Sequence, residues 1–179
     1  MLLLAATVLA SAAINPEHVL HTYWEKLTRA KSIHAKFTIP NAEEQREVVW
    51  ECRASRPFSL ELKGPRYTLT SDGKSAKVKN GGQPIQTRKA SPGDIPPPIE
   101  PFFGSHRLDA AGWKTLSGKQ LVMVFATKMP AQNTSPARIY LDPATALPVA
   151  VQYGFDAQAP IGHIRLFVLD EPKRKEKIR

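Results

Sequence analysis

The residue types that most often carry out chemistry are few in this sequence, and their spacing matches no familiar catalytic pattern. The five histidines are His18, His21, His34, His106 and His163. His18 and His21 are three residues apart, so on a helix they would lie one turn apart, as paired metal ligands can. No third ligand accompanies them, and we interpret them as histidines on a helix surface. The sequence therefore predicts no metal site.

The carboxylates and a search for known nucleophile motifs also indicate no catalytic site. Glu43, Glu44 and Glu47 fall in a polar turn and a strand start, where solvated acids are commoner than a catalytic pair. The chain has no G-x-S-x-G elbow, no P-loop and no G-x-G-x-x-G fingerprint. We expect a protein that is not an enzyme and needs no cofactor. A secreted enzyme of unfamiliar type stays open as an alternative, and the residues to test for it are His34, His106 and His163.

Cys52 is the only cysteine, so the chain forms no internal disulfide and depends on its core for stability. It alternates with Trp50 along an apparent strand, which favours a buried, inert thiol. It also lies far from the N-terminus, so it cannot be the lipid-bearing cysteine of a bacterial lipoprotein.

Composition indicates one folded domain, and the first residues indicate that it is exported. The 179 residues are 42% hydrophobic and 23% charged, and 16 prolines favour short elements joined by loops. Residues 1–12 resemble a signal peptide, because a short apolar run ends in Ala10-Ser11-Ala12. No Lys or Arg precedes the run, so a buried N-terminal strand or a start that lies upstream is the alternative. We expect a single domain over residues 13–170 and a basic tail over 171–179. The mature protein would be soluble in the periplasm or secreted.

The net charge of +9 suits an acidic partner or transient contact with an anionic membrane surface. The tail supplies five of the basic residues without interleaved aromatics, which disfavours nucleic acid. A frayed, solvated tail is the simpler interpretation.

The elements expected are one helix followed by a series of short strands. Asn15-Pro16-Glu17 is a helix start, and the apolar residues that follow share one face over about four turns. Short turns such as Ser71-Asp72-Gly73-Lys74 require antiparallel neighbours. The strands are expected at residues 35–39, 46–53, 58–63, 66–70, 75–79, 84–88, 113–116, 120–127, 137–142, 147–154 and 161–169.

The segment from Ala90 to Gly112 interrupts the strands. It holds five prolines beside Ile99, Phe102 and Phe103, and it is too long for a simple connection. We expect a loop whose apolar part, with a short helix near Ile99–Phe103, packs onto the sheet.

The order of these features resembles the LolA-type periplasmic carriers of outer-membrane lipoproteins and the LolA-like superfamily. The resemblance runs over nearly the whole mature chain. It rests on the helix leading into Ile33–Thr38, on Arg56-Pro57-Phe58, on the Ser71–Lys74 hairpin and on the Pro-rich segment where the family carries its lid. A late hairpin, Ile139–Asp142 followed by Leu147–Val149, completes it.

The resemblance implies an incomplete antiparallel β-barrel, mainly β with α, covered by the N-terminal helix and a lid. It implies a monomeric carrier of lipoprotein acyl chains or another hydrophobic ligand, moving between an inner-membrane donor and an outer-membrane acceptor without chemistry. In such carriers the arginine of the Arg-Pro motif hydrogen-bonds the lid. That role falls here on Arg56, with Arg53 as a rival. The prolines at 96–98 would shorten any lid helix.

Apolar residues on the strands and the lid are candidates for lining a ligand cavity, although each of them could equally be ordinary core. They are Trp50, Leu60, Leu62, Tyr67, Phe102, Phe103, Met123 and Phe125. A second hypothesis keeps the half-barrel but uses it as a protein-interaction module, either a stress sensor or an accessory subunit.

Overall fold

The computed structural model describes residues 14–41, 46–96, 98–104, 106–128, 137–153 and 159–170. The side chains of residues 39–41, 46, 92, 106, 128 and 153 are not described. The predicted signal segment (1–12) and basic tail (171–179) lie outside these ranges, as do Glu43 and Glu44. Within the ranges, no helix combines the length and the apolar character needed to cross a membrane.

The described part of the chain contains one α-helix, eleven strands and two short 3₁₀ turns. These elements are α1 (Pro16–Arg29), β1 (Ser32–Asn41), β2 (Arg46–Ser55), β3 (Ser59–Lys63), β4 (Tyr67–Ser71), β5 (Ser75–Asn80), β6 (Gln86–Lys89), η1 (Pro92–Asp94), η2 (Glu100–Phe103), β7 (His106–Leu116), β8 (Lys119–Lys128), β9 (Ala137–Leu141), β10 (Pro148–Tyr153) and β11 (Ile161–Asp170).

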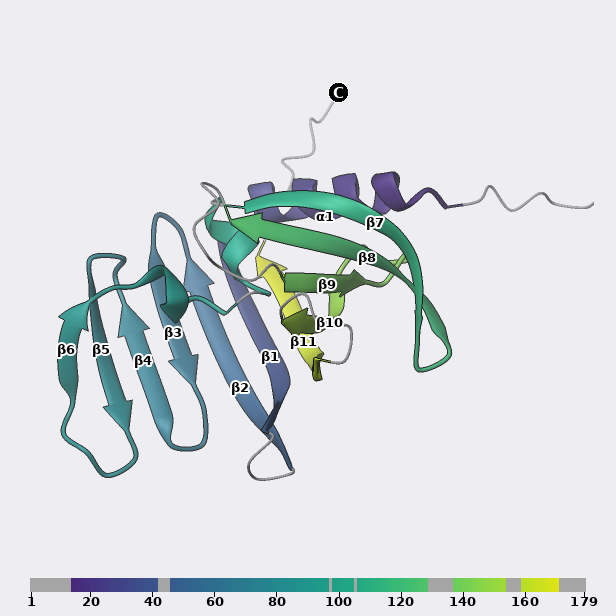
Figure 1. Cartoon of the computed structure of the whole chain (residues 1–179). Coiled ribbons are helices and arrows are strands. Elements are labelled where there is room, and N and C mark those ends of the chain that lie inside the picture. Colours follow the sequence, from purple (N-terminus) through teal and green to yellow (C-terminus); the bar gives the residue numbers. More distant parts are fainter. Residues whose placement is uncertain are drawn as a thin grey trace, which may run out of the picture.

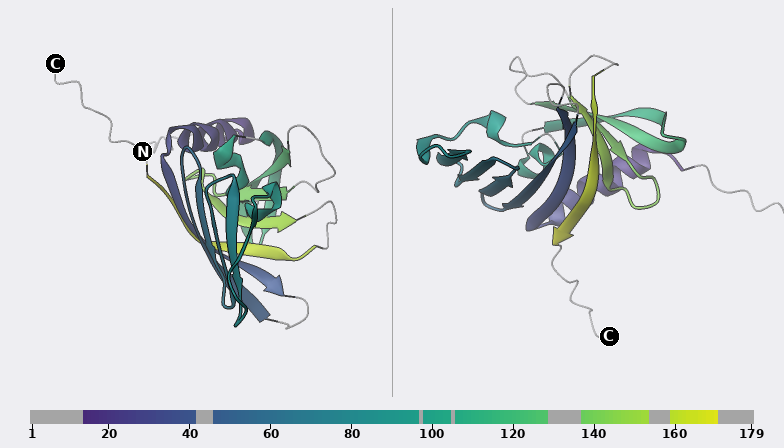
Figure 2. Two further views of the ribbon diagram at one scale, coloured as in Figure 1. Left: turned by 90° about the vertical axis from the view of Figure 1, so that its left-hand side faces the viewer. Right: turned by 90° about the horizontal axis from the view of Figure 1, so that it is seen from below.

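All strands join one antiparallel sheet in the order β6-β5-β4-β3-β2-β1-β11-β10-β9-β8-β7. Because β1 pairs with β11, the first and last strands meet in the middle and β6 and β7 become the two edges. The two halves, β1–β6 and β7–β11, spread away from this central pair (Figures 1 and 2). The predicted fold class, an open antiparallel half-barrel with a helix over it, is confirmed.

Helix α1 begins as its sequence predicts. The Asn15 side chain accepts a hydrogen bond from the Glu17 N–H at 3.0 Å, and Pro16 occupies the first turn. The buried face of the helix carries Val19, Leu20, Tyr23 and Leu27, so it packs against the half of the sheet that contains β7 and β8.

The tight turns also follow the sequence. In the β4–β5 turn the Asp72 carboxylate accepts from the N–H groups of Lys74 and Ser75, both at 2.8 Å, and Gly73 has a φ of +86°. These local hydrogen bonds set the register of the hairpins, and with it which side chains face inward.

Alternation along the strands gives the sheet an inner and an outer face. The inner face, α1 and η2 together form the main core, and the large side chains buried there include Tyr23, Leu27, Ile33, Phe37, Leu60, Leu69, Ile99, Phe102 and Ile139. A smaller cluster around Leu121, Tyr140 and Ala150 lies apart from it.

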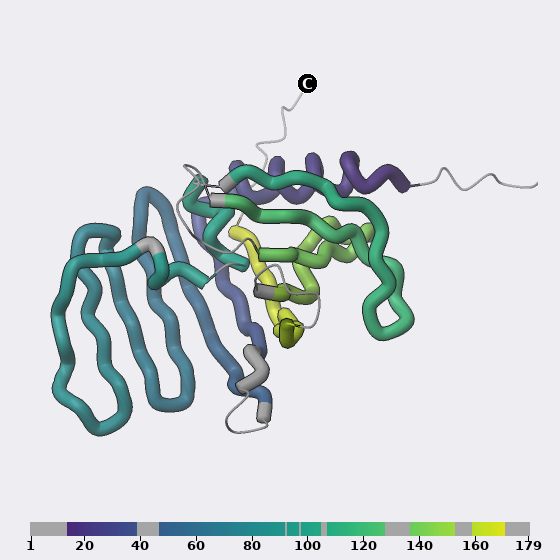
Figure 3. Tube along the Cα trace, in the orientation of Figure 1, coloured from purple at the N-terminus to yellow at the C-terminus, as the bar shows by residue number. Residues whose placement is uncertain are grey.

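The connection from β6 to β7 differs in part from the prediction. The trace leaves the β6 edge and crosses to the β7 edge through η1 and η2 (Figure 3). The lid helices are reduced to two 3₁₀ turns, as expected from the prolines. The expected loop, however, ends at β7, which begins at His106 rather than Trp113. Gly112 (φ +99°) sits at a register shift within this strand, so a strand irregularity was misread as loop.

Candidate functional site

Arg56 connects three separate parts of the chain. It follows β2, and its guanidinium donates to the carbonyl oxygens of Thr28 at 2.7 Å, Leu27 at 3.2 Å and Phe102 at 2.7 Å. The first two carbonyls belong to the last turn of α1, where helical carbonyls lack partners within the helix. Arg56 thus provides hydrogen-bond donors for the carbonyl oxygens at the end of α1 and links that end of the helix to η2.

The ring of Phe102 meets the same guanidinium. The Arg56 Cζ lies 4.6 Å from the centroid of that ring, a cation–π distance. Arg53, the rival at this position, lies on β2 and donates to Glu51 at 3.1 Å on the outer face. Of the two arginines, only Arg56 has a described contact with η2.

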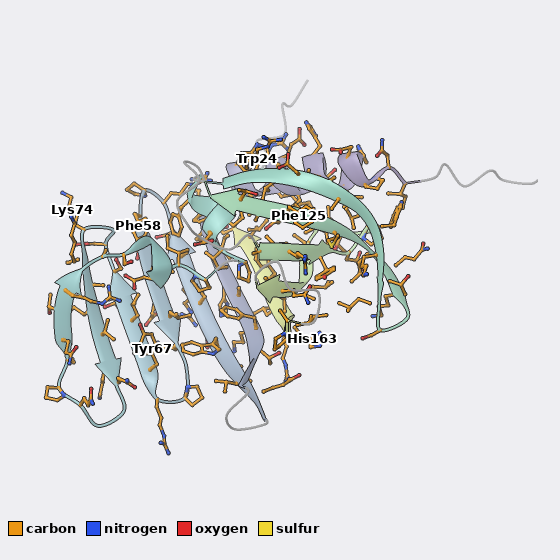
Figure 4. The ribbon with its side chains drawn as sticks, viewed as in Figure 1. Trp24, Phe58, Tyr67, Lys74, Phe125 and His163 are labelled. Atoms are coloured by element: carbon orange, nitrogen blue, oxygen red, sulfur yellow. The ribbon has the colours of Figure 1, made fainter. Side chains whose placement is uncertain are left out.

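We call residues 98–104, the segment around η2, the lid segment. Ile99 and Phe102 are completely buried in the main core, and Gly104 ends η2 with a φ of +82°. Phe103 stacks on Phe58 with ring centroids 4.4 Å apart. Since Phe58 lies two residues after Arg56, the turn after β2 contacts the lid segment through both residues (Figure 4 labels Phe58).

A second set of hydrogen bonds holds the start of the connection from β6 to β7. Both terminal nitrogens of Arg88, on β6, donate to the Asp94 carboxylate in η1, and the Ser91 N–H donates to it at 2.8 Å. Burial by itself would raise the pKa of Asp94, but the bonds from Arg88 and Ser91 outweigh it and lower the pKa from its usual value. No sequence signal predicts this pair, because six residues separate its members and no motif marks them.

Six of the predicted lining residues gather in the main core. Leu60 and Leu62 are buried on β3, and Trp50 meets Tyr67 edge-on with centroids 5.6 Å apart. A Cβ on Gly64 would lie 2.9 Å from the Trp50 ring, so the glycine makes room for it. Phe102 and Phe103 of the lid segment complete the six.

Met123 and Phe125 do not join them. Met123 packs in the smaller cluster with Leu121 and Tyr140, while its strand neighbours Val122 and Val124 enter the main core. Alternation places Phe125 on the same side as Met123. It lies in the other half of the sheet from Tyr67 (Figure 4). Along β8 both faces are apolar, so the sequence could not tell inward from outward residues.

The main core holds one unexpected polar group. Tyr23 is fully buried on α1, and among the described side chains its hydroxyl is the only buried polar atom without a hydrogen-bond partner. Burial raises the pKa of this hydroxyl above its usual value. An unpartnered buried hydroxyl costs stability, so Tyr23 offers an unused donor inside an otherwise apolar space.

Several of the residues first considered for chemistry form pairs with other side chains. His21 approaches Glu25 at 3.9 Å, His34 binds Glu51 at 2.7 Å and Glu47 binds Arg165 at 3.0 Å. Across the described ranges, no three His, Cys, Asp or Glu side chains are grouped to hold a metal ion. The His106 side chain is outside what the structure describes.

Neither a family model nor a curated protein sequence matches the chain. Solved structures similar to it include an uncharacterized conserved protein from Thermus thermophilus, with a TM-score of 0.52 at 10% identity, covering 87% of this chain and 88% of that one. The lipoprotein LppX of Mycobacterium tuberculosis gives 0.46 at 12% identity over 88% and 96% of the two chains. A LolA superfamily protein from Nitrosomonas europaea gives 0.45 at 7% identity over 89% and 96%. At these identities the likeness concerns the fold alone.

Proposed function

We propose that this protein is a carrier or binder of acyl chains, or of a similar hydrophobic ligand, in the cell envelope. It takes up its ligand when the lid segment moves aside, and it performs no chemistry on it. The observation that carries this proposal is the position of Phe102: its side chain is fully buried on the inner face, while its carbonyl oxygen is held by Arg56.

The lid segment fills the place that we assign to the ligand. Ile99 and Phe102 insert apolar side chains between the sheet and α1, as an acyl chain would. η2 itself spans only four residues. A segment this short can move out of the core without unfolding the strands, because the strands keep their hydrogen bonds to one another.

The free energies involved favour replacement of the lid segment by the ligand. A charge-assisted hydrogen bond contributes about 1.5–3 kcal/mol. Burying an acyl chain gains about 0.8 kcal/mol per methylene, or on the order of 10 kcal/mol for a chain of about twelve. Exposing Ile99 and Phe102 costs about a further 1.5–3 kcal/mol each. The gain from the acyl chain still exceeds these costs together, so the ligand can displace the lid segment. The closed state nevertheless lowers the net affinity, so that release to an acceptor remains possible.

The Tyr23 hydroxyl suits the polar end of such a ligand. An ester or carboxyl oxygen that reached it would accept the hydrogen bond that no described protein group accepts. A ligand with an apolar chain and a small polar head fits this description better than a pure hydrocarbon.

Uptake of a fluorescent fatty-acid analogue tests the proposal. The wild type should bind it, and Arg56→Leu should bind it about tenfold more tightly, because the closed state loses its tie. Arg53→Leu is the matched control, since Arg53 is exposed and contacts Glu51 on the outer face. A folded wild type that takes up no analogue, or an equal effect of both variants, would contradict the proposal.

A protein-interaction module is the second candidate, and one feature favours it. A groove of about 620 Å³ runs between α1 and the edge strand β7, and its apolar lining includes Leu20, Trp24 and Leu108. An unpaired strand beside an apolar groove suits an extended peptide. Co-purification of one stoichiometric protein, lost on Leu108→Glu and kept on Arg56→Leu, would support this function over the first.

A further inference from the structure

The outer face of β4, β5 and β6 carries three lysines in one group. Lys77 and Lys79 alternate along β5, and Lys89 lies on β6; all three are exposed. The register places Lys77 between Thr70 and Thr87, while Lys89 pairs with Ser75. Lys79 pairs with Thr68. We call this surface, the three lysines with their hydroxyl-bearing neighbours, the lysine face.

The charges of the lysine face are unmatched, in contrast to the carboxylates on β2 and β3. These carboxylates pair with bases, and the pairs are Glu51 with His34, Lys36 and Arg53, Glu61 with Lys63, and Glu47 with Arg165 of β11. Within the described ranges, no carboxylate lies within 4.0 Å of Lys77, Lys79 or Lys89. Three neighbouring like charges repel one another, and an anionic partner would relieve that repulsion.

One end of the lysine face carries an exposed apolar residue. The β3–β4 and β5–β6 turns meet there, because the Gly81 N–H donates to the Arg66 carbonyl at 2.5 Å. A polar groove of about 540 Å³ lies between the turns, lined in part by Arg66 and Lys79. Ile85, in the second turn, is 65% exposed, the highest value among the large hydrophobic side chains described.

We propose that the lysine face docks this protein onto an anionic phospholipid bilayer. Ammonium and hydroxyl groups are donors for the phosphate oxygens of headgroups, and a sheet face presents them over a broad surface. Ile85 at the rim can enter the boundary between headgroups and acyl chains, where an apolar side chain gains free energy. Nucleic acid is a poorer fit, because the residues of this face include no aromatic side chain on which bases could stack. The proposal is independent of the ligand-binding function above.

Co-sedimentation of the full chain with vesicles tests the proposal. The vesicles are phosphatidylcholine with or without phosphatidylglycerol. Binding is expected only to the anionic vesicles and should disappear at about 1 M salt, where the screening length falls to about 3 Å. Changing Lys77, Lys79 and Lys89 together to Gln should lower the partition coefficient about 100-fold, at about fivefold per lysine near the membrane.

The control changes Lys31, Lys114 and Lys119 to Gln, which removes the same net charge from exposed positions outside the lysine face. This triple variant should bind within about twofold of the wild type, and both triple variants should unfold at the wild-type temperature. Ile85→Ser should weaken binding by a similar factor at every salt concentration at which the wild type still binds, because its contribution is not electrostatic.

Equal losses in the two triple variants would show that only net charge matters and would overturn the proposal. So would failure of the wild type to bind anionic vesicles, or binding of an acidic peptide or an oligonucleotide in their place. Fatty-acid uptake is measured without vesicles, so either proposal can fail while the other stands.

Discussion

Gly162 of β11 lies directly against the backbone of Thr38 in β1, and a Cβ on Gly162 would be 2.5 Å from the Thr38 carbonyl oxygen. The same two strands are joined by the Thr38 hydroxyl, which is buried and accepts from the His163 N–H at 3.2 Å. This contact lies close to the register shift between β1 and β11, where the two halves of the sheet join.

Gly162→Ala should therefore lower the free energy of unfolding by about 2 kcal/mol, because the added methyl group meets backbone that cannot rotate away. Gly82→Ala is the control, since a Cβ there would meet nothing within 4 Å, and it should change stability by less than about 0.5 kcal/mol. Urea unfolding of the two variants measures the difference, and equal midpoints would mean that β1 and β11 separate easily.

Tyr23→Phe should raise the free energy of unfolding of the empty protein by about 1 kcal/mol, because it removes a buried hydroxyl that no described group hydrogen-bonds. It should also weaken fatty-acid binding about fivefold if that hydroxyl meets the polar end of the ligand. Tyr140→Phe is the matched control: its hydroxyl donates to Gln152 at 3.0 Å, so its loss should destabilise by about 1 kcal/mol and leave binding unchanged. Destabilisation of similar size in both variants would contradict the assignment of Tyr23.

Phe102→Ala should lower the free energy of unfolding by about 3 kcal/mol, as expected for a fully buried aromatic ring. The same change should strengthen fatty-acid binding, because it empties space that the ligand must otherwise clear. Trp113→Ala is the comparison. Because the Trp113 ring is exposed, this change should affect the free energy of unfolding and fatty-acid binding only slightly. Weaker binding by Phe102→Ala would instead indicate that Phe102 contacts the ligand in the open state.

Cys52 should be unreactive in the folded protein. Burial first, and then the nearby charge of Glu61, raise the pKa of its thiol from 9.0 to about 12. At pH 8 the reactive thiolate is then about 1,000-fold scarcer than in the unfolded chain, so Ellman's reagent should label Cys52 only after urea is added. Because the folded pKa is the higher one, folding also loses stability as the pH rises from about 9 towards 12, and Cys52→Ala should reduce that alkaline loss. Rapid labelling of the native protein would contradict the buried position.

Much of the fold could be predicted from local signals. Asn15 and Pro16 mark the start of α1, and the alternation of Leu60 with Leu62 and of Tyr67 with Leu69 predicts inward-facing strands. β7 was the exception, because Gly112 and the preceding prolines have the composition of a loop, while pairing with β8 holds the segment in the sheet. Sequence patterns describe what a segment prefers by itself, and partners far away in the chain can override them.

By itself, the sequence determined the succession of one helix and eleven strands, the hairpin turns and the inward faces of most strands, since these depend on contacts within a few residues. Only the tertiary structure decided which distant groups meet. Arg56 binds a carbonyl 46 residues later, the Tyr23 hydroxyl has no hydrogen-bond partner among the described groups, and Met123 lies outside the main core. The curvature of the sheet sets these contacts. It arises from all eleven strands together, so no single segment carries a signal for it.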